Sequence, residues 1–167
     1  MSVNFIDYGI IFSAKYLGYV LLAVFLILFI KNRNKSFLLV PLISALVSRF
    51  VFTEIIRFFY FRPRPFVEKA LIPLIEHAPD ASFPSGHAAF YFALSVGVYW
   101  HNKKAGLWFF AASAAISLAR VFAGVHYISD ILGGFVVAIL SYWLVKSFSK
   151  NFVSFFKKKQ DQISVLP

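Results

Sequence analysis

Arg120, His126 and Asp130 stand close together in an otherwise apolar part of the sequence. A charged side chain at membrane depth costs about 2.5–3.5 kcal/mol even on lenient insertion scales, so such a cluster indicates a functional site that faces a cavity. His126 and Asp130 are four residues apart, which on a helix places both side chains on one face, where the carboxylate can orient the imidazole. A histidine held in this way is suited to act as a nucleophile.

Two more arginines have the chemistry to bind the same ligand. Arg57 and Arg64 are separated by six residues, and Arg64 is followed by Pro65. Arginine is a permanent cation whose forked N–H donors match the oxygens of phosphate. We therefore expect Arg57, Arg64 and Arg120 to bind a phosphate group and to stabilise the charge on its oxygens in the transition state.

The run Pro84-Ser85-Gly86-His87 predicts the start of a helix. Proline suits the first helical turn, which leaves the N–H groups of the next three residues free to bind an anion. Gly86 lets the backbone approach the ligand closely, so Ser85 and Gly86 are candidate phosphate-binding residues. Displacement at phosphorus needs a nucleophile and an acid for the leaving oxygen, and we expect His126 and His87 to fill these roles.

The elements that must position these residues are membrane helices. Of the 167 residues, 60% are hydrophobic, 20% are aromatic and 14% are charged. Soluble domains carry about 25% charged residues, and the mean hydropathy here is +0.75. The composition therefore predicts an integral membrane protein.

Charge and cysteine content exclude several other classes. The formal net charge is +10, but the basic residues lie between apolar segments and not on one face of a soluble module, so nucleic acid is not an expected partner. The chain has no cysteine, which excludes disulfides, thiolate chemistry and cysteine-based zinc sites. The composition leaves the oligomeric state open.

Hydropathy divides the chain into five apolar segments, each close to the roughly 20 residues that span a bilayer. The predicted fold class is all-α, a polytopic membrane helical bundle of about five transmembrane helices, preceded by a short interfacial helix. The segments are residues 16–31, 36–60, 84–101, 105–124 and 128–148. Residues 3–14 form either the interfacial helix, which we favour, or an extension of the first span. Residues 1–150 are expected to form one domain, and residues 151–167 a basic and aromatic cytoplasmic tail.

The distribution of Lys and Arg predicts the orientation, because cytoplasmic loops carry an excess of cations. Ten cations flank one end of the spans: Lys31, Arg33, Lys35, Lys103, Lys104, Lys146, Lys150, Lys157, Lys158 and Lys159. We expect this end and the C-terminus to be cytoplasmic. An odd number of spans then places the N-terminus and the candidate site on the outer face.

The order and spacing of the motifs resemble the three signatures of the type 2 phosphatidic acid phosphatase superfamily. Those signatures are a basic residue, six others and Arg-Pro; Pro-Ser-Gly-His; and Ser-Arg, five others, His, three others, Asp. The resemblance implies a reaction that needs no metal and no cofactor and passes through a phosphohistidine on His126, with His87 as the acid. It also implies that Arg57 stands where the first signature has its basic residue and binds phosphate with Arg64, Ser85 and Arg120.

The sequences 64–68 and 77–83 and the small size also resemble bacterial undecaprenyl-diphosphate phosphatases of the bacitracin-resistance type. This resemblance implies a lipid diphosphate substrate and a place in the bacterial inner membrane, with the active site on its periplasmic or extracellular face. The chain departs from the pattern at two positions. Gly86 stands where those enzymes often have Asp, and Ala119 replaces the usual Ser of the third signature.

Several alternatives stay open. The same chemistry suits phosphatidylglycerol phosphate, phosphatidic acid or a lipid A phosphate, and a non-catalytic lipid-phosphate binder or transporter would keep the anion site. A binder needs only the cations, so the two histidines and Asp130 favour an enzyme. Arg49 and Glu54 match no signature, and we expect them to form a structural ion pair or a polar link to a neighbouring helix.

Overall fold

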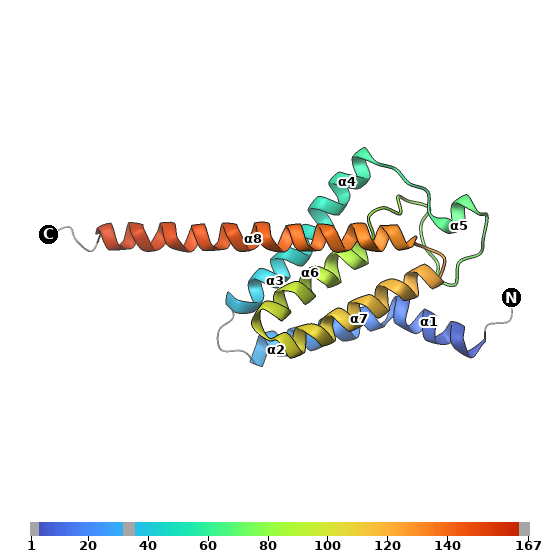
Figure 1. Cartoon of the computed structure of the whole chain (residues 1–167), viewed down its shortest axis with the longest axis horizontal. Coiled ribbons are helices and arrows are strands. Elements are labelled where there is room, and N and C mark those ends of the chain that lie inside the picture. Colours follow the sequence, from blue (N-terminus) through green and yellow to red (C-terminus); the bar gives the residue numbers. More distant parts are fainter. Residues whose placement is uncertain (1–3, 32–35, 164–167) are drawn as a thin grey trace.

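The computed structural model describes the backbone of residues 4–31 and 36–163, and the side chains of residues 4–31 and 38–149. Every regular element in this part of the chain is helical (Figure 1), so the predicted all-α class is confirmed. The helices are α1 (Phe5–Lys15), α2 (Leu17–Lys31), α3 (Ser36–Val47), the π-helix η1 (Ser48–Phe52), α4 (Thr53–Phe59), α5 (Pro65–Glu68), α6 (Gly86–His101), α7 (Lys103–Phe122) and α8 (Ile128–Ile163).

Three helices among the described residues are long and apolar enough to cross a membrane. They are the continuous helix Leu38–Phe59, α7, and α8 as far as Ser149, and α1 with α2 can form a fourth span that is bent by 43°. The remaining predicted segment is α6, which has only 16 residues. At 1.5 Å per residue it is about 24 Å long, shorter than the hydrocarbon core of about 30 Å.

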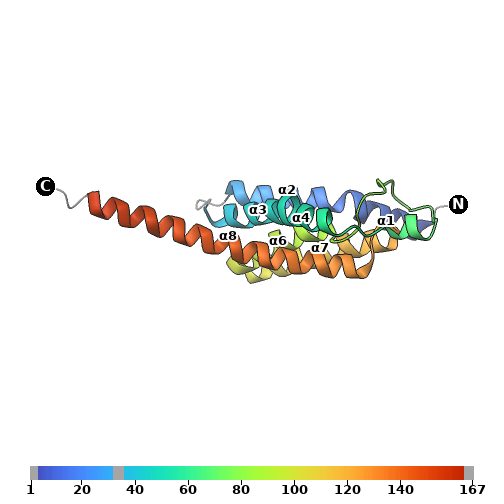
Figure 2. The ribbon, with the colours of Figure 1, turned by 90° about the horizontal axis from the view of Figure 1, so that it is seen from above.

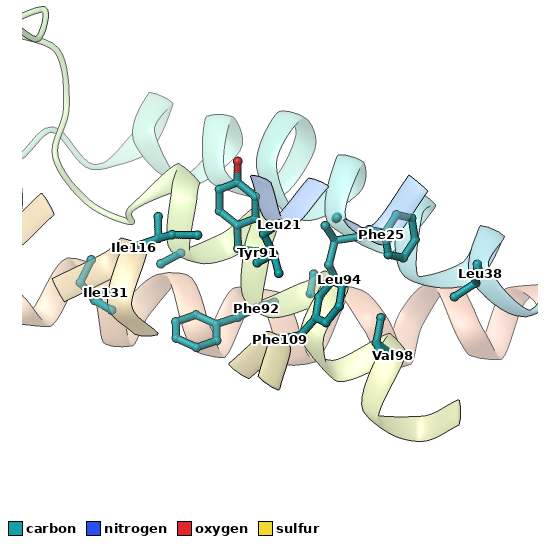
Figure 3. Packing of buried hydrophobic residues seen from close by; sticks show 14 residues of the cluster. Leu21, Phe25, Leu38, Tyr91, Phe92, Leu94, Val98, Phe109, Ile116 and Ile131 are labelled. Atoms are coloured by element: carbon teal, nitrogen blue, oxygen red, sulfur yellow. The ribbon is translucent and has the colours of Figure 1, made fainter. Parts of the chain in front are cut away.

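Although it is short, α6 lies at the centre of the bundle (Figure 2). It packs against α3, α7 and α8, and most of its residues are buried. The core around it is apolar and aromatic: Leu94 is fully buried in it, and the rings of Phe25 and Phe109 meet edge to face with their centres 6.4 Å apart (Figure 3). A buried polar contact joins α6 to α7 within this core, between the hydroxyls of Ser95 and Ser113 at 2.9 Å.

The N-terminal lead-in forms a separate helix, α1, and its interfacial position stays a prediction. Asn4 begins α1 with a capping box, in which its side chain accepts from the Asp7 N–H and the Asp7 carboxylate accepts from the Asn4 N–H. The bend between α1 and α2 follows directly. The Arg120 guanidinium donates to the carbonyl of Ala14 near this bend at 3.2 Å, which ties α1 to α7.

The long segment of residues 60–85 lies at one end of the bundle, beside the α7–α8 connection (Figure 1). The two are joined by the Leu74 N–H, which donates to the Ala123 carbonyl at 3.1 Å, and by Arg64, which donates to the Val125 carbonyl at 2.8 Å. The α6–α7 turn, with Lys103 and Lys104, lies at the opposite end. The predicted site residues therefore gather away from these two cations.

Several of the cations that predict the orientation belong to residues or side chains that the structure does not describe. Arg33 and Lys35 lie outside the described residues, as do residues 164–167 of the predicted tail. The side chains of Lys150, Lys157, Lys158 and Lys159 also lie outside the described part, although α8 continues without a break to Ile163. The predicted boundary at residue 150 thus falls inside a helix.

Close packing of α6 on α3 depends on a glycine, which gives a test of the fold. A Cβ at Gly97 would lie 2.3 Å from Cγ and 2.9 Å from Cα of Pro41, whereas a Cβ at Gly9 in α1 would meet nothing within 4 Å. Overpacking costs about 1–3 kcal/mol. We expect Gly97→Ala to melt at least about 2 °C below Gly9→Ala in detergent. Both variants replace a helical glycine by alanine and so gain the same helix propensity. Equal melting temperatures would therefore contradict the close packing of Gly97 on Pro41.

Candidate active site

Asp130 is the point at which the parts of the site meet. Its side chain is fully buried in the first turn of α8. One carboxylate oxygen accepts from the Tyr127 N–H at 2.8 Å and lies 3.2 Å from Nδ1 of His126, while the other accepts from Arg62 at 3.0 Å. Its main-chain carbonyl accepts from the Ser85 N–H at 3.0 Å. One residue therefore joins α8 to the histidine, to the long loop and to the start of α6.

These contacts orient His126, which is 3% exposed. Because the Asp130 carboxylate accepts from Nδ1–H, the unprotonated nitrogen is Nε2, which lies 3.3 Å from an N–H donor of Arg64. The predicted His126–Asp130 pair is thus present. It forms between the loop and the helix start, because α8 begins only at Ile128, and not along one helix face as the spacing suggested.

Burial also keeps the His126 imidazole neutral. His126 lies in the connection between α7 and α8, and desolvation lowers its pKa to about 4, helped by the charges of Arg64 and Arg120 and opposed by Asp130. An ordinary histidine has a pKa of about 6.5. At neutral pH the Nε2 lone pair is therefore available for attack on an electrophile.

The buried side chain of Arg64 is fixed by hydrogen bonds to one carboxylate and two main-chain carbonyls. It is 1% exposed and donates through Nε to Asp80 at 2.9 Å and to the carbonyls of Val125 and Ala81 at 2.8 and 3.2 Å. Partial burial acts to raise the pKa of Asp80, but the hydrogen bond and charge of Arg64 outweigh it and hold that pKa below its ordinary value. The Arg64 guanidinium therefore has a fixed anionic partner as well as its contact with His126.

Arg120 links the second histidine to this group. It is 4% exposed, and one N–H donor lies 3.4 Å from Nε2 of His87. Within the described part of the chain it forms no ion pair, and its buried Nε has no hydrogen-bond partner there. The Nε of Arg57 is buried without a partner in the same way. Buried donors are almost always satisfied, so both groups indicate a place for an anionic acceptor.

Arg57 lies between the start of α6 and two carboxylates. It donates to the Pro84 carbonyl at 3.1 Å, and its guanidinium is 3.7 Å from Glu54 and 3.6 Å from Asp80. The expected link between Arg49 and Glu54 is also present as an ion pair. Arg57 therefore belongs to a line of alternating charges that runs from Arg49 toward His126.

The start of α6 differs in detail from the prediction. Pro84 lies outside the helix, Ser85 is the N-cap, and Gly86 is the first helical residue. Because the Ser85 N–H donates to Asp130, the expectation that this group is free to bind an anion is wrong. The Ser85 hydroxyl oxygen accepts from the Ala88 N–H at 3.5 Å, as N-cap side chains do, so the N–H groups available at this helix start are those of Gly86 and His87.

Sequence reasoning assigned no role in the site to three polar residues of the long loop. Arg62 donates to Asp130 and lies over the ring of Tyr127 at 3.9 Å. Asp80 bridges arginines, and the His77 ring lies 6.3 Å from the His126 ring. His77 and Asp80 lie in the segment 77–83 that carries part of the resemblance, but no spacing rule connects them or Arg62 to the signatures. Among the described residues, no cluster of His, Asp and Glu is arranged to hold a metal ion.

The structure thus brings together a buried histidine, a carboxylate that orients it and several arginines at one end of a helical membrane bundle, an arrangement suited to binding a phosphate group. Comparison with known proteins supplies the family. Residues 38–154 match the PAP2 superfamily, and the chain belongs to it. The expected class, an integral membrane phosphatase of lipid phosphates, is thereby confirmed.

Individual relatives agree with this assignment. Undecaprenyl-diphosphatase BcrC of Bacillus subtilis is 33% identical over 146 residues, which cover 86% of this chain and 75% of that protein. Phosphatidylglycerophosphatase B of Bacillus subtilis is 32% identical over 97 residues, 52% of this chain and 47% of that protein. The crystal structure of Aquifex aeolicus LpxE superposes with a TM-score of 0.71 at 27% identity and covers 85% of this chain and 86% of that one.

The lowered pKa of His126 can be measured directly. We expect its side-chain ¹⁵N chemical shifts to keep the pattern of a neutral ring from pH 8 to pH 5, and to report protonation only as the pH falls toward about 4. The His126→Gln variant identifies the signals by their loss. A midpoint at or above the ordinary value of about 6.5 would show that Asp130 outweighs burial and that the nucleophile is protonated near neutral pH.

Proposed function

We propose that the protein hydrolyses undecaprenyl diphosphate to undecaprenyl phosphate and inorganic phosphate, with His126 as the nucleophile. The observation that carries this proposal is the unprotonated Nε2 of His126 beside Arg64, in a cluster that also contains buried arginine donors without partners. The choice of lipid is supported by the relative from Bacillus subtilis that is named for this activity.

The first step transfers the terminal phosphoryl group to the enzyme. His126 Nε2 attacks the terminal phosphorus, a P–N bond forms, and the bond from phosphorus to the bridging oxygen breaks. The bridging oxygen leaves with undecaprenyl phosphate and takes a proton from His87. Asp130 keeps Nδ1–H of His126 in place and stabilises the positive charge that develops on the ring.

The second step releases the phosphate. A water molecule gives a proton to His87 and attacks the phosphorus, the P–N bond breaks, and His126 returns to its neutral form. Arg57, Arg64 and Arg120 bind the phosphoryl oxygens, together with the Ser85 hydroxyl and the backbone at Gly86. The same donors stabilise the charge on the equatorial oxygens in both transition states. His87 acts first as an acid and then as a base.

We place the site on the periplasmic or extracellular face of a bacterial inner membrane, with the C-terminus in the cytoplasm. The support is the excess of cations at the other end of the spans. In the described part of the chain, Lys103 and Lys104 mark that end, opposite the loop that carries the site. A lipid carrier exposed at the outer face is the substrate that this orientation suits.

A second candidate substrate is phosphatidylglycerol phosphate. The support is the partial likeness to phosphatidylglycerophosphatase B. Phosphatidic acid and lipid A phosphate carry the same reacting group and differ in the lipid. A non-catalytic binder or transporter would need the arginines but not a histidine whose tautomer is fixed by a buried carboxylate, and this geometry favours the enzyme.

Replacing each histidine tests the assigned roles. We expect His126→Ala to lower phosphate release from undecaprenyl diphosphate at least about 10³-fold because the nucleophile is lost. His87→Ala should lower it about 10²- to 10⁴-fold through loss of acid catalysis. His101→Ala is the matched control, since His101 ends the same helix at its far end. Unchanged turnover in either site variant, with an unaltered melting temperature, would rule out the assigned role.

Comparing lipids tests the substrate. We expect the purified protein in detergent, with EDTA present throughout, to release phosphate from undecaprenyl diphosphate with a kcat/KM at least about tenfold above that for phosphatidylglycerol phosphate or phosphatidic acid. No step in the scheme passes through a metal, so EDTA should not change the rate. A higher kcat/KM for a phospholipid would overturn the lipid assignment, and activity that returns only with Mg²⁺ would overturn the mechanism.

A further inference from the structure

Arg49 lies beside the site although it belongs to none of the signatures. It is in η1, a π-helical turn within the helix that runs from α3 to α4. The turn is fixed by the Ser48 hydroxyl, which donates to the Ala89 carbonyl of α6 at 3.1 Å, and by the Thr53 hydroxyl, which donates to the Ser48 carbonyl at 2.8 Å. Such π turns are frequent at functional sites, and this one holds Arg49 against the start of α6.

Contact between Arg49 and α6 depends on the absence of a side chain at Gly86. A Cβ at Gly86 would lie 2.6 Å from Nε and 2.7 Å from Cδ of Arg49. The guanidinium therefore rests on the first turn of the helix that carries His87. The Arg49 side chain is 29% exposed and so remains open to a ligand.

A cleft of about 140 Å³ opens at this contact, lined by Arg49, Phe50, Gly86, His87, Phe90 and Tyr91. One water molecule needs about 10–15 Å³ of such space, so the cleft has room for a phosphate group. One wall is cationic and carries the helix start, while Phe50, which is 61% exposed, begins an apolar surface. The cleft thus combines a place for an anion with a place for a hydrocarbon chain.

In the proposed reaction the leaving group lies on the side of this cleft. In an in-line displacement the leaving oxygen departs opposite the attacking Nε2 of His126, on the side of the acid, His87. His87 faces Arg120 through its Nε2 and also lines the cleft with Arg49. For a lipid diphosphate, the leaving group begins with the second phosphate, the one attached to the lipid.

We propose that Arg49 binds the lipid-attached phosphate of a diphosphate substrate in this cleft and thereby selects diphosphates over monophosphates. The inference rests on the proposed function, because it takes His126 as the nucleophile and His87 as the acid. Glu54 is a positioning residue, since its carboxylate pairs with Arg49 and lies 3.7 Å from Arg57.

A purely structural role does not account for Arg49. Its partner Glu54 is 50% exposed, and ion pairs between exposed groups contribute little to stability. Arg49 also lies over the ring of Phe50, with Cζ 5.1 Å from the ring centre. Neither the ion pair with Glu54 nor the contact with the Phe50 ring explains why the guanidinium of Arg49 packs on Gly86, next to His87.

Two non-hydrolysable lipids of equal chain length test the inference: farnesyl methylenediphosphonate and farnesyl phosphonate. The full-length protein in detergent is titrated with each, and Kd is measured by calorimetry. We expect Arg49→Gln to raise Kd for the diphosphonate at least about tenfold, the usual effect of losing a hydrogen bond to a charged group, and to change Kd for the phosphonate less than about threefold. The charge-matched control Lys69→Gln should change neither value.

The outcomes separate this inference from the proposed function. An equal change for both lipids, or no change, would overturn the role of Arg49. Arg49→Lys keeps a cation and should raise Kd for the diphosphonate less than Arg49→Gln does. If Arg49→Gln does not fold, Arg49→Lys replaces it in the test. A rise in Kd for the diphosphonate alone then supports the role of Arg49, and an equal rise for both lipids overturns it. Failure of the wild-type protein to hydrolyse undecaprenyl diphosphate would instead overturn the proposed function, whatever the two Kd values show.

Discussion

The buried carboxylate of Asp130 is the constraint on which the site depends. A carboxylate without water is stable only when it is paired and hydrogen-bonded, and Asp130 obtains its partners from His126, the Tyr127 backbone and Arg62. Its main-chain carbonyl adds the Ser85 N–H. Satisfying this one residue therefore fixes the tautomer of the candidate nucleophile, the path of the long loop and the position of α6 against α8. The scaffold and the chemistry are set by the same contacts.

Charge is distributed unevenly around His126. Arg64 and Arg57 share the carboxylate of Asp80, and Arg57 also lies near Glu54. Arg120, in contrast, contacts a carbonyl and an imidazole and forms no ion pair in the described part of the chain. The uncompensated positive charge of Arg120 therefore lies beside His87 and also acts on His126. An anion bound there gains from the low dielectric of the interior. This imbalance favours the binding of an anion.

The sequence alone was enough to predict the helices and the central residues, since hydropathy locates apolar segments and the signatures have fixed spacing. It was not enough for contacts that depend on how the loop folds back. Arg62 reaches Asp130 across 68 positions, and Asp80 joins Arg57 and Arg64 only after the loop closes on the α7–α8 connection. The π turn at Arg49 could not be predicted either, because it does not change the pattern of apolar residues in the segment 36–60. Ser85 shows the same limit, because its N–H is taken by a carbonyl from another helix.

The length of α6 connects the fold to the lipid. The helix is about 24 Å long, and the hydrocarbon core is about 30 Å thick. With the α6–α7 turn at one boundary of the membrane, the start of α6 lies roughly 6 Å short of the other boundary, below the level of the lipid headgroups. The long loop folds over the start of α6 and contributes Arg62, Arg64 and Asp80 at this level. Under the proposed function, a lipid diphosphate would place its reacting phosphate at this level, and Phe50, which is 61% exposed beside the cleft, would offer apolar surface to its chain.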